Sequence, residues 1–229
     1  MSSSNPPQTP IQRDSSDELS VEVIYRDDDY AVINKPPGLL SVPGLVSPDN
    51  AFDQIASLYP NARIVHRLDM ATSGLLVFAL HYQAQKHLSK QFERRQVRKG
   101  YRALLQGLLM TNAGEIHSPL ICDWPNRPKQ KIDWLGGKPA STLFRLLVRE
   151  PESNTSYVAL TPLTGRSHQL RVHMLQLGHP IVGDSLYGNR QTRQPSRMYL
   201  HASELCFHTE SGLELELSCP PSFAPPSAL

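Results

Sequence analysis

The run Gly74–Leu80 constrains the fold most, because it is nearly all apolar over a length typical of a β-strand. A strand without polar alternation has to be covered on both faces, so it belongs inside a sizeable core. The chain has 229 residues, of which 39% are hydrophobic, and this is enough material for such a core. We therefore expect a rigid sheet whose ends can hold functional loops in place.

The other expected elements are mostly consecutive strands with few strand–helix alternations. This order favours an α+β fold with a mixed, mainly antiparallel central sheet flanked by helices. In the last helix we expect Ser167 to cap the start, Gly178 to end it, and Leu170, Met174 and Leu177 to form its core stripe. Strands are predicted at Val21–Tyr25, Tyr30–Asn34, Tyr101–Gly107, Ser156–Pro162, Met198–His208 and Leu213–Leu217, and helices at Phe52–Tyr59, His81–Gln96 and Ser167–Leu177.

The chain is expected to form one domain. Residues 1–19 are rich in Ser and Pro, and we expect them to form a disordered tail. Residues 20–229 are expected to form a single catalytic domain, in which the proline-rich run Pro220–Leu229 is an extended end. No apolar run is long enough to cross a membrane, and the first residues, which lack a basic patch followed by an apolar stretch, are not expected to be a signal peptide. Three isolated cysteines favour a reducing, cytoplasmic location over a disulfide framework or a zinc site: Cys122, Cys206 and Cys219.

The strongest catalytic candidate lies just before the apolar strand. His66, Arg67 and Asp69 crowd into four positions, and Gly74 follows them. Taken alone, this segment is an ordinary surface loop with a local ion pair. Its place at the end of a buried strand makes Asp69 a candidate catalytic carboxylate, because rigid elements hold catalytic loops.

A basic segment follows the apolar strand. Solvated helix faces usually alternate in charge sign, whereas residues 81–107 carry only one acid, Glu93, so the segment suits a polyphosphate partner. A tyrosine at position 101, on the predicted strand, is by itself more often a core residue than a functional one. The basic residues of the segment are Lys86, Lys90, Arg94, Arg95, Arg98, Lys99 and Arg102.

A third polar segment, residues 163–173, has two arginines, two histidines and a glutamine at the start of the last predicted helix. His168 and His173 are five residues apart and do not share a helix face as a zinc-binding pair does, so no metal site is expected. The run Gly136-Gly137-Lys138 resembles part of a phosphate-binding loop, but Pro139 follows it. Nucleotide hydrolysis and nicotinamide chemistry are therefore poorly supported.

Together these segments resemble the RluA family of pseudouridine synthases. The run 66–69 (H-R-L-D) is similar to the catalytic motif of that family. The runs 34–38, 99–101 and 165–171 match its other motifs in the same order, and the resemblance covers roughly residues 20–220. The runs 41–44 and 120–131 look most like the dual-specificity members. The resemblance implies the pseudouridine synthase fold with a central RNA-binding cleft, without the S4 RNA-binding domain that larger members often carry.

The resemblance also implies an activity, which is isomerisation of uridine to pseudouridine in 23S rRNA and in the tRNA anticodon stem-loop. This reaction has no redox step, so no cofactor is expected, and a monomer is sufficient for a single-site enzyme of this size. Asp69 would be the catalytic carboxylate, and whether it bonds to C6, attacks C1′ or drives a glycal route stays open. Arg171 would pair with Asp69, Tyr101 would stack on the flipped uracil and take the C5 proton, and Leu170 would pack on the opposite face. Arg67 would occupy the space left by the uridine. His66, Arg166 and His168 are expected in the site wall, and Lys99, Arg98, Arg127, Lys129 and Lys131 on RNA phosphates.

Two alternative functions stay open from the residues alone. A non-catalytic RNA-binding module explains the basic segment, but it leaves a carboxylate among cations unexplained, since Asp69 would repel phosphate. An Asp-dependent nucleoside hydrolase usually needs a second carboxylate. Asp184 is the only obvious candidate for it in the matching segments.

Overall fold

The computed structural model describes residues 21–44, 47–188 and 197–223. The predicted disordered tail 1–19 and the last residues of the proline-rich end therefore lie outside the described residues. In the described part of the chain, no helix is long and apolar enough to cross a membrane.

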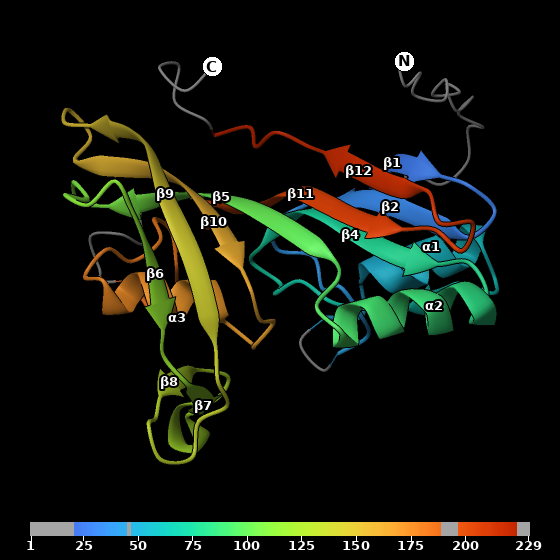
Figure 1. Ribbon diagram of the computed structural model, residues 1–229, viewed down its shortest axis with the longest axis horizontal. Helices are drawn as coiled ribbons and strands as arrows, with labels where there is room; N and C mark the ends of the chain where they lie inside the picture. The colour runs from blue at the N-terminus through green and yellow to red at the C-terminus, as the bar shows by residue number, and fades with distance from the viewer. Residues whose placement is uncertain (1–20, 45–46, 189–196, 224–229) are drawn as a thin grey trace.

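One ten-stranded sheet organises the molecule (Figure 1). Among its described strand pairs only β4 and β11 run parallel, which confirms the predicted mixed, mainly antiparallel α+β fold. The spatial order is β1 (Glu22–Arg26), β2 (Tyr30–Lys35), β4 (Ser73–Ala79), β11 (Leu200–His208), β5 (Arg98–Gln106), β10 (Thr155–Pro162), β9 (Ser141–Glu150) and β6 (Ala113–His117), with β12 (Glu214–Ser218) beside β11 and β3 (Arg63–Ile64) beside β4.

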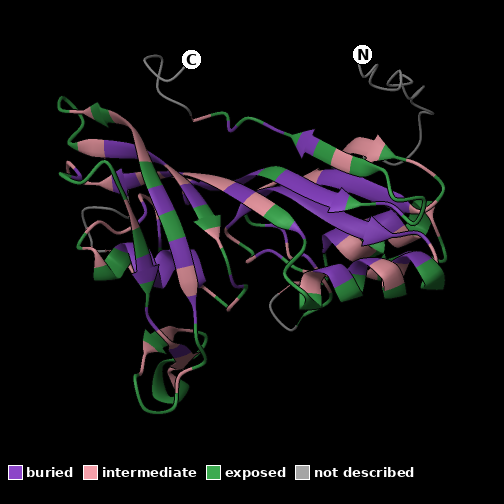
Figure 2. Ribbon diagram, in the orientation of Figure 1, coloured by how far each residue is buried: buried purple, intermediate pink, exposed green. Residues whose placement is uncertain are grey.

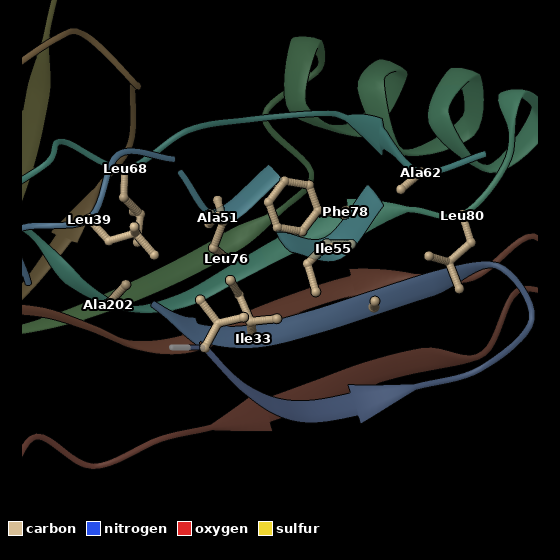
Figure 3. Packing of buried hydrophobic residues seen from close by; sticks show 12 residues of the cluster. Ile33, Leu39, Ala51, Ile55, Ala62, Leu68, Leu76, Phe78, Leu80 and Ala202 are labelled. Atoms are coloured by element: carbon tan, nitrogen blue, oxygen red, sulfur yellow. The ribbon is translucent and has the colours of Figure 1, made fainter. Parts of the chain in front are cut away.

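Strand β4 is buried along its whole length, as the apolar run predicted (Figure 2). Its residues alternate between two hydrophobic clusters, so these clusters lie on opposite faces of the sheet. Leu76 and Phe78 pack against Ile55 of helix α1 (Ala51–Leu58), as Figure 3 shows. Leu75 and Val77 share the other cluster with helix α2 (Tyr82–Glu93). Coverage of both faces makes β4 a rigid support for the loop that precedes it.

Helix α3 (Gln169–Gln176) packs under the other half of the sheet, against β5 and β10. Its predicted start was wrong: the N-cap is His168 in a left-handed conformation, without a capping hydrogen bond from its side chain. The predicted core stripe is confirmed, because Leu170 and Met174 belong to a buried hydrophobic cluster and Leu177 packs against it. Burial extends beyond the stripe, to all six residues from Gln169 to Met174. The predicted end is confirmed, since Gly178 has a φ of +81° and donates its N–H to Leu175 O at 2.9 Å.

A small two-stranded arm projects from the body below α3 (Figure 1). It comprises residues 119–139, and we call it the β7–β8 arm. Strands β7 (Leu120–Cys122) and β8 (Gln130–Ile132) pair antiparallel around a short 3-10 helix, Trp124–Asn126. These strands, together with β3, β6 and β9, were not predicted from the sequence.

The fold is expected to lose stability in mild acid because His201 resists protonation. Its ring bonds to Ser73 Oγ at 2.8 Å and to Cys219 O at 3.0 Å, and burial, only partly offset by the Cys219 bond, lowers its pKa to about 4. An unfolded histidine titrates near pH 6.5, so below that pH the unfolded chain binds a proton that the folded chain does not. The free energy of unfolding should then fall as pH drops, by up to about 1.4 kcal/mol per pH unit from this one residue.

Urea unfolding at about pH 7 and about pH 4.5 measures this loss. The variant His201→Gln keeps a neutral polar side chain, and it should show a smaller difference between the two conditions. An equal difference in both proteins would contradict the assignment to His201.

Candidate active site

The loop before β4 is clamped on both sides of Asp69. Ser41 Oγ accepts the Leu68 N–H at 3.0 Å and donates to the Leu68 carbonyl at 2.8 Å. Lys35 is fully buried, and its Nζ donates to Met70 O at 3.1 Å and to two carbonyls of its own loop. Burial lowers the pKa of Lys35 to about 7, while the nearby Asp69 opposes this shift. The backbone on either side of Asp69 is therefore held by buried polar contacts.

Gly74 fixes the same loop from the strand side. Its φ of +108° is one that side-chain-bearing residues rarely adopt, and a Cβ there would collide with the backbone of Ala202 in β11. Ala202 is also the pairing partner of Tyr101 in β5. This close approach brings the Asp69 loop and Tyr101 to the same place in the sheet.

Arg171 joins two carboxylates at the base of the site. Its Nε and Nη2 donate to Asp184 at 2.7 Å each, and its Nη1 lies 3.4 Å from Asp69 Oδ2. Asp184 is 1% exposed and Asp69 is 19% exposed, so only Asp69 faces the solvent-accessible side. Burial alone would lower the pKa of Arg171, but the hydrogen bond and charge of Asp184 raise it overall. Arg171 therefore stays cationic beside Asp69.

His168 adds a neutral contact to Asp69. Its Nε2 is 3.9 Å from Asp69 Oδ2, and its Nδ1 is 2.7 Å from the hydroxyl of Tyr187. Burial, which outweighs the attraction of Asp69, lowers the pKa of His168. Tyr187 OH in turn accepts the backbone N–H of Gln130 in the β7–β8 arm at 2.6 Å. A continuous set of contacts thus links the arm to Asp69.

Asp69 opens into a cleft of about 800 Å³ between the two halves of the sheet. Tyr101 and Leu170 line it as predicted, and so do Arg67 and Arg166. Burial and the nearby Asp69 carboxylate raise the pKa of Tyr101, so its phenol keeps its proton in the resting enzyme. Arg67 is exposed, whereas Leu170 is buried in the wall.

His66 belongs to the structural wall of the cleft. Its Nε2 accepts the Val77 N–H at 3.1 Å, and its ring stacks on Phe92 with centroids 4.7 Å apart. Burial and the Lys99 charge lower the pKa of His66 to about 3. The histidine is therefore neutral and a hydrogen-bond acceptor toward β4.

Acidic side chains from other strands neutralise part of the positive charge of the basic segment. Arg98 pairs with Glu214 at 2.9 Å and Arg102 with Glu204 at 2.6 Å. These acids come from β12 and β11, so the interpretation of one-sign charge over residues 81–107 was wrong for these two positions. Lys99 lies in the cleft near the Phe92 ring, and burial lowers its pKa.

The three other predicted phosphate-binding residues lie on the β7–β8 arm rather than in the cleft lining. Arg127 and Lys131 are exposed and Lys129 is half-buried. The Arg127 guanidinium covers the ring of Trp124 at 3.8 Å from the centroid. Over the described residues there is no group of three or more His, Cys, Asp or Glu side chains that could hold a metal ion.

Several residues around Asp69 have contacts that the sequence did not predict. Lys35 lies in a run that matches the family, but no role followed from that match. Ser41 likewise lies in the matching run 41–44 without a role of its own, Tyr187 gave no signal, and Asp184 was considered only as a second catalytic acid. The structure instead places both Asp184 oxygens against Arg171, with one of them also accepting the Leu186 N–H at 2.9 Å.

A carboxylate fixed beside a buried arginine at the bottom of a cleft with several cations defines an enzyme site that suits a polyanionic substrate. Residues 29–176 match the RNA pseudouridylate synthase family, and the chain belongs to this family. It is an isomerase that converts uridine in RNA to pseudouridine.

The chain is similar to two bacterial proteins, each named dual-specificity RNA pseudouridine synthase RluA. It is 49% identical to the one from Pasteurella multocida over 207 residues, which covers 89% of this chain and 94% of that protein. It is 45% identical to the one from Escherichia coli K12 over 227 residues, which covers 97% and 99%. The solved structure of human RNA pseudouridylate synthase domain containing 1 is 33% identical, with a TM-score of 0.77 and coverage of 91% of this chain and 86% of that chain.

The geometry also bears on the hydrolase alternative. Asp184 is buried and fully engaged by Arg171, which together with two backbone N–H groups holds its pKa below the usual range despite burial. A general acid has to hold a proton, and Asp184 does not. Glu93 also lines the cleft, and it is exposed.

Proposed function

We propose that this isomerase modifies one uridine in 23S rRNA and one in the tRNA anticodon stem-loop. The observation that carries the proposal is the position of Asp69, an accessible carboxylate 3.4 Å from a buried arginine in a cleft that Tyr101 also lines. The bacterial relatives are named as dual-specificity enzymes, and this supports action on two classes of RNA. The two classes share a loop from which a uridine can leave the stack at low cost.

In this proposal Asp69 acts on the ribosyl–uracil centre. The C1′–N1 bond of the uridine breaks, the uracil turns and a C1′–C5 bond forms. The proton on C5 leaves and N1 gains a proton, so that the product is an isomer of the substrate. No electron transfer occurs, so the reaction requires no redox cofactor. Arg171 places a cation 3.4 Å from the Asp69 carboxylate. Its firm attachment to Asp184 keeps that cation in place through the reaction.

Tyr101 and Leu170 are proposed to hold the flipped uracil between them, and Arg67 to take the space it leaves in the RNA. A planar guanidinium stacks well on bases, and Arg67 is exposed at the cleft. Arg166, His168 and His66 form the wall. Lys99 and the arm residues Arg127, Lys129 and Lys131 would contact phosphates, which position an RNA without reading its sequence. Arg98 would do so while it is also paired with Glu214.

We also propose that residues 20–229 form one catalytic domain and that the enzyme works as a cytoplasmic monomer. All the groups assigned to the site come from a single chain, and three free cysteines fit a reducing compartment.

Tritium release from stem-loop RNAs labelled at uracil C5 tests the substrate proposal, because formation of pseudouridine replaces that hydrogen. We expect release from both a 23S rRNA stem-loop and a tRNA anticodon stem-loop. A control stem-loop of equal length with the loop uridines replaced by cytidines and the label in the stem should release none. Release from only one of the two RNAs would contradict dual specificity, and release of free uracil would contradict the isomerase assignment.

Replacing Tyr101 with Phe is expected to reduce tritium release by about 10²–10⁴-fold, the usual contribution of a positioned acid–base group. The ring still stacks, but the phenol oxygen that would take the C5 proton while passing its own proton to water is absent. RNA binding should stay close to that of the wild type, and a gel-shift assay measures it. Full activity of Tyr101→Phe would refute the proton-transfer role.

A further inference from the structure

A second hollow, of about 440 Å³, lies between the β7–β8 arm and the loop before α3. Gly165 and Arg166 line both this hollow and the catalytic cleft. Arg166 therefore stands at the boundary between the two spaces. None of the roles assigned above uses this second hollow.

The walls of the second hollow combine an apolar surface with polar groups. Ile121 is half-buried and faces Gly136, where a Cβ would lie 3.6 Å from Ile121 Cδ1. Lys138 and Ser167 line the same hollow and are exposed. An apolar wall beside a lysine and a hydroxyl suits a nucleobase with its phosphate, since unstacked bases pair a flat apolar face with polar edges.

The second hollow is fixed relative to the catalytic cleft. Arg166 Nε donates to Pro139 O at the base of the arm at 3.1 Å. On the other side, the Gln130 N–H donates to Tyr187 OH, which contacts His168 in the cleft wall. These bonds tie the arm to the active-site loop at two points, so the spacing of the two hollows is built into the fold.

We propose that the second hollow binds a nucleotide of the RNA next to the flipped uridine, with the connecting phosphate at Arg166. This inference rests on the proposed placement of the uridine in the catalytic cleft. It assigns to the arm a role in selecting RNA: a substrate needs two neighbouring unstacked bases, which a loop offers and a regular duplex does not.

Cys122 provides a probe, because it lines the second hollow and is half-buried, whereas Cys206 and Cys219 are buried. Burial also raises the pKa of Cys206 to about 11, which keeps it as an unreactive thiol. Alkylation of Cys122 by N-ethylmaleimide should slow by about tenfold when about 90% of the enzyme is bound to a substrate stem-loop. Uridine monophosphate at saturation should leave the rate unchanged, because it fills the cleft alone.

Protection of Cys122 could arise because a base fills the hollow or because the RNA covers the whole arm. Stem-loops that lack one base distinguish these two causes. Two RNAs are compared, one abasic on the 5′ side of the target uridine and one abasic on the 3′ side. When one of these two RNAs is bound, as a gel shift demonstrates, Cys122 should be alkylated at the rate of the enzyme without RNA. Protection by both abasic RNAs equal to that by the intact RNA would overturn the proposal, as would an absence of protection by the intact RNA.

Enzyme alkylated at Cys122 gives a functional measure. Its KM for the intact stem-loop should rise by about tenfold with little change in kcat, which corresponds to the loss of one stacked base. The variant Cys122→Ser treated in the same way should keep its KM. An unchanged KM of the alkylated wild type would contradict the proposal. If unmodified enzyme releases no tritium from these RNAs, the substrate proposal fails, while protection of Cys122 still reports on the hollow.

Discussion

The Asp69→Asn enzyme is expected to release no measurable tritium from uracil-labelled RNA, a loss of at least about 10⁴-fold, which is the scale seen when a catalytic nucleophile is removed. The amide has the same shape as the carboxylate but carries no charge. It can neither bond to the substrate nor stabilise a cationic ribosyl centre. All three routes open to Asp69 require the ionised carboxylate, so the prediction does not depend on which atom it attacks.

Stability and RNA binding should both survive this change. Arg171 keeps its two 2.7 Å bonds to Asp184, so the buried arginine is not left unpaired. Removing a negative charge from a cleft lined by several cations should leave the Kd for RNA equal or lower, and filter binding measures it. Asp28→Asn, the same change at an exposed turn acid, should retain full activity. Substantial tritium release by Asp69→Asn would refute the proposed mechanism.

The variant Arg171→Met is expected to lose activity and about 3–5 kcal/mol of stability together. The loss arises because Asp184, which is 1% exposed, would be left as an uncompensated buried charge. For a chain of this size the loss corresponds to a fall in Tm of about 6–20 °C. Urea unfolding and thermal unfolding both measure the effect.

The double variant Arg171→Met/Asp184→Asn separates the two consequences. It removes the buried charge along with its partner, so it should regain part of the stability that the single variant lost. It should stay inactive, because Asp69 still lacks its cation. Stability of the double variant at or below that of Arg171→Met would contradict the assignment of Asp184 as the anchor of Arg171. Activity restored together with stability would show that Arg171 has only a structural role.

The sequence was most informative where function depends on a short run of residues. Asp69 and Gly74 lie within six residues of each other, and the apolar strand after them is unmistakable in composition. The mixed sheet was predictable for the same reason, because strands of consistent pattern follow one another. The strands of the arm and β9 are short or half-exposed, and they lack the alternation that would reveal them.

Contacts between distant parts of the chain could not be predicted. Ser41 and Leu68 are 27 residues apart, and Tyr187 and Gln130 are 57 apart. The same limit explains the misjudged charge of the basic segment. Glu204 lies 102 residues from the arginine it neutralises, and only the pairing of β11 with β5 brings the two together.

The position of β11 sets the order in which the enzyme becomes functional during its synthesis. This strand joins the two halves of the sheet, between β4 and β5, although it begins only at Leu200. On the ribosome, the Asp69 loop and Tyr101 are made long before the strand that aligns them, and chain growth at about 5–20 residues per second separates the two events by several seconds. The nascent chain thus carries both side chains before the cleft is assembled, and we expect activity toward RNA only once β11 has emerged.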